Sequence, residues 1–155
     1  MNQVRVLVVD DSVTIRAMMR QVLESDPGIR ITGMAASAEE AEAMMEGCIP
    51  HVITLDIEMP GKGGLAFLEE VLKTHKTPVI MLSSHAARGD DTRIKALMSG
   101  AVGCFNKANV IRDKARLIRL VKDAARHRAR LDPEDKAAVQ MMKDAACQVE
   151  QLATG

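Results

Sequence analysis

The chain has 155 residues, enough for one domain with a hydrophobic core and one further element. Its 21 basic and 21 acidic residues cancel, which excludes an overall charge that would draw it to nucleic acid or to an anionic membrane. No apolar stretch approaches the ~18–20 residues that cross a bilayer, and the three scattered cysteines give no disulfide framework, so we expect a cytoplasmic protein without membrane insertion.

Five short apolar runs predict the strands of one parallel sheet. They are nearly continuous and mostly β-branched, as strands covered on both faces are. The runs are 4–9, 29–34, 52–55, 79–82 and 101–105. Amphipathic segments between them, and one that starts at about Asn109, predict five helices, with a capping box at Ser37 and Glu40 and a helix stop at Gly100. This alternation predicts a doubly wound α/β fold on a five-stranded parallel sheet.

The C-terminal segment 131–155 predicts an extra helical element that follows a domain at 1–130. Asp132 suits the N-cap position, with Pro133 at the first helical position, so we expect a helix at about 133–152. Its apolar stripe consists of Ala138, Met141, Met142, Ala145, Val149 and Leu152. The stripe needs cover from the domain itself, from a second copy or from a partner. The alternative is a disordered tail, because the stripe is rich in alanine.

Polar side chains follow four of the five predicted strands. Asp10 and Asp11 follow the first run and Asp56 the third, whereas Ser83 follows the fourth and Lys107 the fifth. The carboxyl ends of parallel strands share one edge of the sheet, so these groups should converge there. Carboxylates that converge repel one another unless a proton or a cation joins them, and oxygen ligands in an open site favour Mg²⁺. Taken singly, each residue is more commonly a helix cap or a solvated side chain, but the joint placement favours a site for a phosphoryl group, with a carboxylate as nucleophile.

Four motifs, in this order and spacing, resemble the receiver domains of two-component response regulators. They are VLVVDDS, VITLDIEMP, PVIMLSS and GAVGCFNK. The resemblance covers roughly residues 1–127, and in motif detail the chain looks most like the receiver of chemotaxis methylesterases. It implies a flavodoxin-like (CheY-like) sheet with strand order 2-1-3-4-5.

The resemblance also implies a role for each acidic residue. Asp56 would accept a phosphoryl group from a histidine kinase or a phosphotransfer protein. Asp11 and Asp56 would bind Mg²⁺ directly, Asp10 would act mainly through water, and the backbone carbonyl of Glu58 would be a further ligand. The glycine-rich loop 61–64 would leave room for the incoming histidine, with an ordinary turn as the alternative.

Ser83 and Lys107 carry the readout that the resemblance implies, and here the sequence departs from the family pattern. Ser83 would move toward the phosphoryl oxygens and Lys107 would pair with them. Ala108 replaces a proline that follows a cis peptide bond in the family; because a non-proline cis bond costs roughly 2.5–4 kcal/mol, we expect a trans bond. Cys104 replaces a switching aromatic residue, and Phe105 should point to the other face of the strand. We therefore expect that Asp56 is still phosphorylated, whereas the way the protein signals differs from the family pattern.

A basic segment at 112–130 offers a second hypothesis. It holds eight Lys and Arg against two Asp, and a helical wheel puts its arginine stripe opposite the apolar side. The stripe is Arg112, Arg116, Arg119, Arg126 and Arg130. A solvated face is the ordinary explanation, and the alternative is a phosphorylation-independent module for an acidic partner or a nucleotide second messenger. No helix-turn-helix follows, so we expect no binding to duplex DNA.

The leading hypothesis is a single-domain receiver, not an enzyme, that signals through phosphorylation-dependent protein–protein contacts, with chemotaxis suggested by the resemblance alone. A Mg²⁺-dependent aspartyl phosphatase is less favoured, because those enzymes place the nucleophile after the first strand and a second Asp two residues later. Here Asp56 follows the third strand and Glu58 lies two residues on. The sequence leaves the output protein unknown; a homodimer would use the face of the fourth and fifth helices or the C-terminal helix.

Overall fold

A five-stranded parallel sheet forms the centre of the computed structural model, which describes residues 2–61, 63–84 and 91–154. The strand order is β2-β1-β3-β4-β5, which confirms the predicted fold class and topology. The strands are β1 (Val4–Val9), β2 (Ile29–Ala35), β3 (Val52–Asp56), β4 (Val79–Ser83) and β5 (Gly103–Asn106). Every residue of β3 and β4 is buried, as their continuous apolar runs predict for strands covered on both faces.

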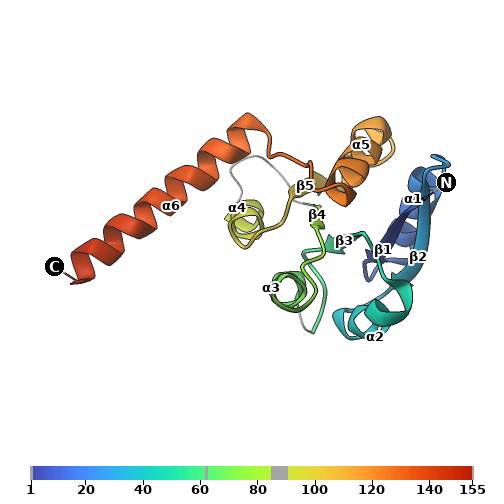
Figure 1. Cartoon of the computed structure of the whole chain (residues 1–155), viewed down its shortest axis with the longest axis horizontal. Coiled ribbons are helices and arrows are strands. Elements are labelled where there is room, and N and C mark those ends of the chain that lie inside the picture. Colours follow the sequence, from blue (N-terminus) through green and yellow to red (C-terminus); the bar gives the residue numbers. More distant parts are fainter. Residues whose placement is uncertain (1, 62, 85–90, 155) are drawn as a thin grey trace.

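Helices cover both faces of the sheet (Figure 1). On one face lie α1 (Val13–Leu23) and α5 (Lys114–Ala125), and on the other lie α2 (Ala38–Cys48), α3 (Gly64–Thr74) and α4 (Asp91–Met98). Successive side chains of a strand point to opposite faces, so each strand supplies both halves of the core. Cys104 accordingly packs with the α2, α3 and α4 side, whereas Phe105 packs with the α1 and α5 side, as predicted.

Helix ends follow the predicted signals. The Ser37 hydroxyl accepts a hydrogen bond from the backbone N–H of Glu40 at 3.1 Å, and the Glu40 carboxylate accepts one from the N–H of Ala36 at 2.7 Å. Ser37 thereby satisfies an N–H group that the first turn of α2 leaves without a helical partner, and Glu40 binds the N–H of the residue before the N-cap. Gly100, two residues after the end of α4, adopts φ +111°, a conformation that favours glycine. Both the capping box and the helix stop are confirmed.

The fifth helix begins later than predicted. A 3₁₀ turn, Lys107–Asn109, follows β5, and α5 starts only at Lys114. The side chain of Asn106 accepts a hydrogen bond from the N–H of Ala108 at 2.9 Å, which closes a local turn. Asparagine side chains offer the backbone such alternatives to a helix, so the apolar periodicity from residue 109 onward was misleading. No cis peptide bond occurs among the described residues, so the Lys107–Ala108 bond is trans, as expected.

The predicted arginine stripe is wrong as a single helix face, because α5 is shorter than the stripe. Only Arg116 and Arg119 lie within α5. The Arg116 guanidinium lies 4.7 Å from the centroid of the Phe105 ring, and one of its nitrogens lies 3.9 Å from a carboxylate oxygen of Asp132. Arg116 therefore packs against the domain and an acidic neighbour instead of joining an uninterrupted cationic surface.

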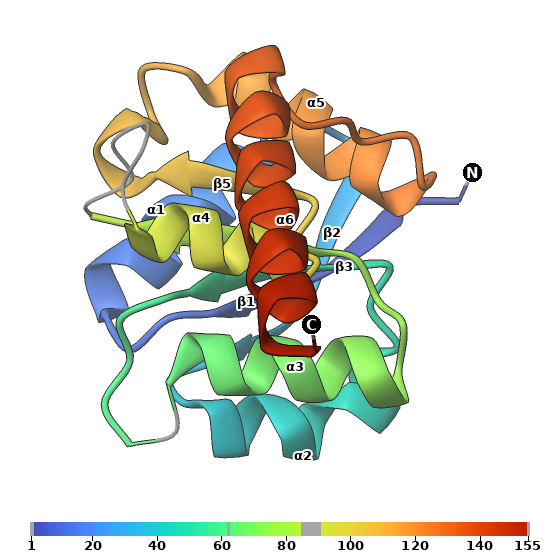
Figure 2. The same ribbon diagram turned by 90° about the vertical axis from the view of Figure 1, so that its left-hand side faces the viewer.

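A sixth helix, α6 (Pro133–Thr154), confirms the predicted C-terminal element. Its first turns pack on α4, where Asp135 and Val139 are buried. The Asp135 carboxylate accepts hydrogen bonds from Arg93 Nε at 3.0 Å and from a terminal nitrogen of Arg93 at 2.6 Å. The rest of α6 extends away from the sheet (Figure 1), and Figure 2 shows it crossing in front of α4 and β5. Within the described part of the chain, none of the helices combines the length and the apolar character that a bilayer span requires.

Candidate functional site

The carboxyl ends of β1 and β3 bring three carboxylates together at one edge of the sheet. Asp10 and Asp11 follow β1, and Asp56 is the last residue of β3. One carboxylate oxygen from each of the three lies within 4.8 Å of the others. Asp10 and Asp56 are buried, whereas Asp11 is exposed at the mouth of the cluster. The sequence-predicted acidic group therefore forms one cluster.

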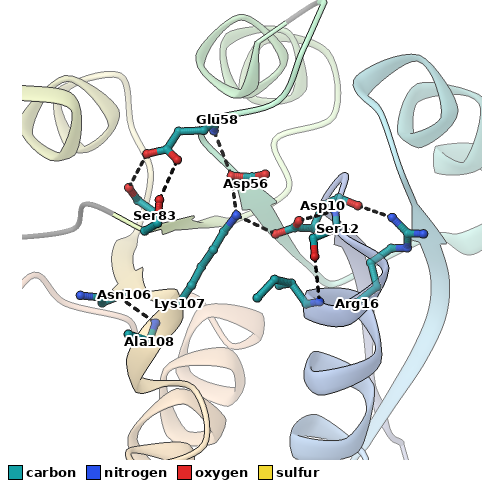
Figure 3. Close-up of polar contacts among 11 residues, drawn as sticks. Asp10, Ser12, Arg16, Asp56, Glu58, Ser83, Asn106, Lys107 and Ala108 are labelled. Carbon is teal, nitrogen blue, oxygen red and sulfur yellow. Dashed lines mark hydrogen bonds and ion pairs between the residues drawn. The ribbon is translucent and has the colours of Figure 1, made fainter.

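Lys107 reaches into this cluster from the 3₁₀ turn after β5 (Figure 3). Its Nζ lies 2.9 Å from Asp56 Oδ1 and 3.1 Å from Asp10 Oδ2. The Lys107 side chain is only 14% exposed, so these ion pairs lie in a largely dry environment where charge interactions are strong. The replacement of proline by Ala108 has not displaced the lysine from the carboxylates.

Backbone donors hold the two buried carboxylates in place. The N–H of Ser12 donates to Asp10 Oδ1 at 2.9 Å, and the N–H of Glu58 donates to Asp56 Oδ1 at 2.9 Å (Figure 3). Asp56 Oδ1 thus receives a hydrogen bond and lies beside Lys107. Asp56 Oδ2 is buried and has no hydrogen-bond partner among the described residues. The Asp56 carboxylate therefore has one oxygen held by hydrogen bonds and one without a hydrogen-bond partner among the described residues.

Burial has the largest effect on the pKa of each of the two buried carboxylates. It raises the pKa of Asp56, although Lys107 and the N–H of Glu58 pull the other way. Burial also raises the pKa of Asp10, and the neighbouring Asp56 charge adds to this effect. For Lys107, burial lowers the pKa, but Asp56 and Asp10 together outweigh burial and leave the pKa raised. The cluster holds three carboxylates against one lysine and is short of positive charge.

The residues present fit a hard divalent cation. All the donors are carboxylate oxygens, which Mg²⁺ prefers, and the three that converge lie within 4.8 Å of one another. Asp11 lies on the exposed side, where ligands could be completed by water. The donor set and the charge deficit both favour a magnesium site.

Ser83 and Ser84 lie at the end of β4 and face Glu58. The Ser83 hydroxyl donates to Glu58 Oε1 at 3.2 Å, and the Ser84 hydroxyl donates to Glu58 Oε2 at 2.8 Å (Figure 3). The Glu58 carboxylate thus accepts hydrogen bonds from both serines. Sequence reasoning considered only the backbone carbonyl of Glu58 and missed this role of its side chain. No spacing rule pairs residue 58 with residues 83 and 84, which come together only through the pairing of β3 with β4.

Glycine is needed where the loop after β3 enters α3. A Cβ on Gly64 would collide with the backbone carbonyl oxygen of Asp56 and lie 2.9 Å from the Cα of Ile57. A Cβ on Gly63 would meet nothing within 4 Å. Gly61 adopts φ +75°, a conformation that favours glycine. The requirement for a residue without a side chain is therefore concentrated at Gly64, where α3 starts against the backbone of Asp56.

Comparisons with known proteins identify a family for this chain. Residues 6–122 match the model of the response regulator receiver domain. The chain is 46% identical over 107 residues to protein-glutamate methylesterase/protein-glutamine glutaminase 1 of Xanthomonas campestris pv. campestris, a match that covers 69% of this chain and 30% of the relative. It is 44% identical over 124 residues to the enzyme of the same name from Rhizobium johnstonii, covering 79% of this chain and 36% of the relative.

A solved structure with similar architecture is the response regulator domain of Thermotoga maritima CheB. The TM-score is 0.75 at 33% sequence identity, and the superposition covers 81% of this chain and 98% of that domain. The chain spans about a third of the length of the curated relatives it matches.

Proposed function

The chain belongs to the response regulator receiver family, and from this premise we propose that Asp56 accepts a phosphoryl group from a histidine kinase or a phosphotransfer protein. The observation that carries the proposal is the contact of Lys107 with two buried carboxylates, at 2.9 Å from Asp56 and 3.1 Å from Asp10. A lysine buried beside an acceptor carboxylate is placed to balance the charge that a phosphoryl group brings.

Asp56 Oδ2 is the proposed nucleophile. Oδ1 already accepts a hydrogen bond from the N–H of Glu58 and lies beside Lys107, whereas Oδ2 has no described partner. In the proposed step, an Oδ2 lone pair forms the O–P bond of an acyl phosphate as the P–N bond of the phosphohistidine breaks. The electron pair of the P–N bond returns to the imidazole, which leaves and takes up a proton from solvent. Lys107 and the N–H of Glu58 favour the ionised form of Asp56 that this step requires.

The same cluster would hold Mg²⁺ through Asp11 and Asp56, with Asp10 acting mainly through water and the backbone carbonyl of Glu58 as a further ligand. Support comes from the three carboxylates that converge within 4.8 Å and from the single lysine that faces them. When bound, Mg²⁺ supplies positive charge that offsets both the carboxylates and the incoming phosphoryl oxygens.

The Glu58 carboxylate would act as the resting partner of the switch. Before phosphorylation it accepts hydrogen bonds from Ser83 and Ser84. A phosphoryl group on Asp56 presents new anionic acceptors, which compete with Glu58 for the Ser83 hydroxyl. Movement of Ser83 would shift the end of β4 and bias the surface of α4 and β5 between two states. The aromatic readout common in the family has no counterpart here, because Cys104 stands at that position.

The output would be a phosphorylation-dependent protein–protein contact in the cytoplasm and not the turnover of a small substrate. The family match covers residues 6–122. The relatives that are named methylesterases and glutaminases are about three times as long as this matched segment. The likeness to methylesterase receivers supports a chemotaxis-related pathway.

Acetyl phosphate tests the acceptor chemistry directly. Incubation with Mg²⁺ and measurement of the intact mass should show one added phosphoryl group on the wild-type chain. Asp56→Asn and treatment with EDTA should each abolish it, whereas Asp144→Asn, on the exposed part of α6, should leave it unchanged. A phosphoryl group that persists in Asp56→Asn, or a wild-type chain that binds Mg²⁺ but gains no mass, would contradict the proposal.

A further inference from the structure

The outer part of α6 carries an apolar face that the described residues do not cover. Every residue from 141 to 154 is exposed. The exposed fractions are 72% for Met141, 48% for Met142, 65% for Val149 and 84% for Leu152. Large apolar side chains are rarely grouped in this way on a monomer unless they meet a partner.

The apolar side chains of α6 fall on one side of the helix. At about 100° per residue, the apolar positions between 138 and 153 occupy an arc of about 160°, with only alanines between the four large side chains. Gln140, Asp144 and Gln151 lie on the opposite side. A face of this width is typical of a helix packed in a bundle, and most helical stability in proteins comes from packing such a face.

The described part of the receiver does not reach this face. Asp135 and Val139 anchor the start of α6 on α4, and the helix then continues without a break to Thr154. A straight helix cannot fold back over the domain, and Figure 1 shows its end pointing away from the sheet. An anionic membrane surface is also a poor match, since residues 139–154 carry Lys143 against Asp144 and Glu150.

Charge along one edge of the face selects the partner. Lys143 and Glu150 flank the apolar arc on the same edge. They are two turns apart, about 10 Å along the axis, so they do not pair within one helix. In an antiparallel pair of helices, each such edge meets its own counterpart, and Lys143 of each copy faces Glu150 of the other. In a parallel pair, this edge would instead meet Ala138 and Ala145.

We propose that the outer part of α6 is a self-association surface, on which a second copy of this chain docks its own α6 in the antiparallel direction. The register that pairs Lys143 with Glu150 also places Met142 beside Ala153, and Ala146 beside Val149, of the second copy. The contact is twofold symmetric, so each ion pair occurs twice. Because the overlap is short, the dimer is weak and concentration-dependent. The proposal depends on α6 and not on the chemistry of Asp56, so either can fail without the other.

Sedimentation of the full chain over a range of concentrations, with charge-reversal variants, tests this surface. Lys143→Glu puts two Glu–Glu contacts into the dimer, and Glu150→Lys puts in two Lys–Lys contacts. Each single variant should weaken dimerisation about tenfold, because two exposed pairs change from attraction to repulsion. The double variant Lys143→Glu/Glu150→Lys should restore dimerisation to within about threefold of wild type, a rescue that only antiparallel pairing gives.

Two further variants compare the apolar face of α6 with the opposite side of the helix. Val149→Asp should abolish the dimer, whereas Gln151→Lys, on the opposite side of the same turn, should leave it unchanged. A wild-type chain that stays monomeric up to several hundred micromolar would overturn the proposal, and so would a monomer that binds vesicles of anionic phospholipid through α6. A dimer that is insensitive to both single charge reversals would also overturn it, because the contact would then lie elsewhere.

Discussion

Replacement of Asp135 with alanine should release α6 from the receiver while the receiver stays folded. The Asp135 carboxylate meets Arg93 through two hydrogen bonds, at 3.0 and 2.6 Å, and both side chains are only 8% exposed. Bidentate pairs of this kind are among the stronger polar contacts in proteins. Asp135→Ala removes this carboxylate from a buried guanidinium.

The loss of stability depends on whether the Arg93 guanidinium stays buried or becomes exposed to water. Removal of one partner of a buried ion pair typically costs about 3–5 kcal/mol when the other charge stays buried. Here the buried residues of α6, Asp135 and Val139, both lie near its start, so the helix can leave α4 and let Arg93 reach water. The loss is then limited to the docking of α6, to which burial of Val139 adds about 1.5–2 kcal/mol. We therefore expect global unfolding to become easier by only about 1–2 kcal/mol, while docking itself weakens by about 3 kcal/mol, roughly a hundredfold.

Hydrogen exchange measured by mass spectrometry separates the two effects. Peptides from the first turns of α6 should lose protection in Asp135→Ala, whereas peptides from β1 and β3 should keep it. Lys136→Ala, an exposed neighbour on the same helix, is the matched control. The pair Arg93→Met with Asp135→Leu should restore protection, because well-packed apolar residues often replace a buried ion pair without loss. Unchanged exchange of α6 in Asp135→Ala would refute the reasoning.

Three further predictions concern the site. At ten times its dissociation constant, Mg²⁺ should stabilise the wild-type chain by about 1.4 kcal/mol, a rise in Tm of about 4 °C that EDTA reverses and that Asp56→Asn largely removes; an equal rise in the variant would place the ion elsewhere. Glu58→Ala should raise the affinity for beryllofluoride about fivefold in a titration, since the serine hydroxyls no longer have to leave a carboxylate; unchanged affinity would show that Glu58 does not restrain the site. Gly64→Ala should lower the free energy of unfolding in urea by about 2–4 kcal/mol, whereas Gly63→Ala should change it by less than about 0.5 kcal/mol; similar losses would contradict the close approach at Gly64.

The acidic cluster was predictable because it follows from one rule of sheet geometry. Asp10, Asp56, Ser83 and Lys107 each follow an apolar run, and parallel strands end at a common edge. The sequence thus predicted both the residue types of the cluster and its position at the edge of the sheet. It also gave the alternating faces of β5, on which Cys104 and Phe105 point to opposite halves of the core.

The contacts that sequence reasoning missed join segments with no common period. Glu58 meets Ser83 and Ser84 because β3 and β4 are neighbours in register, and Arg93 meets Asp135 because α6 returns to α4 after α5. The later start of α5 was missed for a different reason. Asn106 makes a local side-chain turn that outweighs the helical periodicity after it.

The sequence by itself determined the fold class, the acidic cluster and the existence of the C-terminal helix, because periodicity and helix-end signals act over short stretches of chain. Tertiary structure alone decided that Lys107 still reaches Asp56 without the family's proline, that Glu58 holds the serines, and that α6 is pinned at Asp135 while its outer part stays uncovered. Those outcomes depend on which elements become neighbours after folding, since distances of a few ångströms between remote residues are set by packing and not by local pattern.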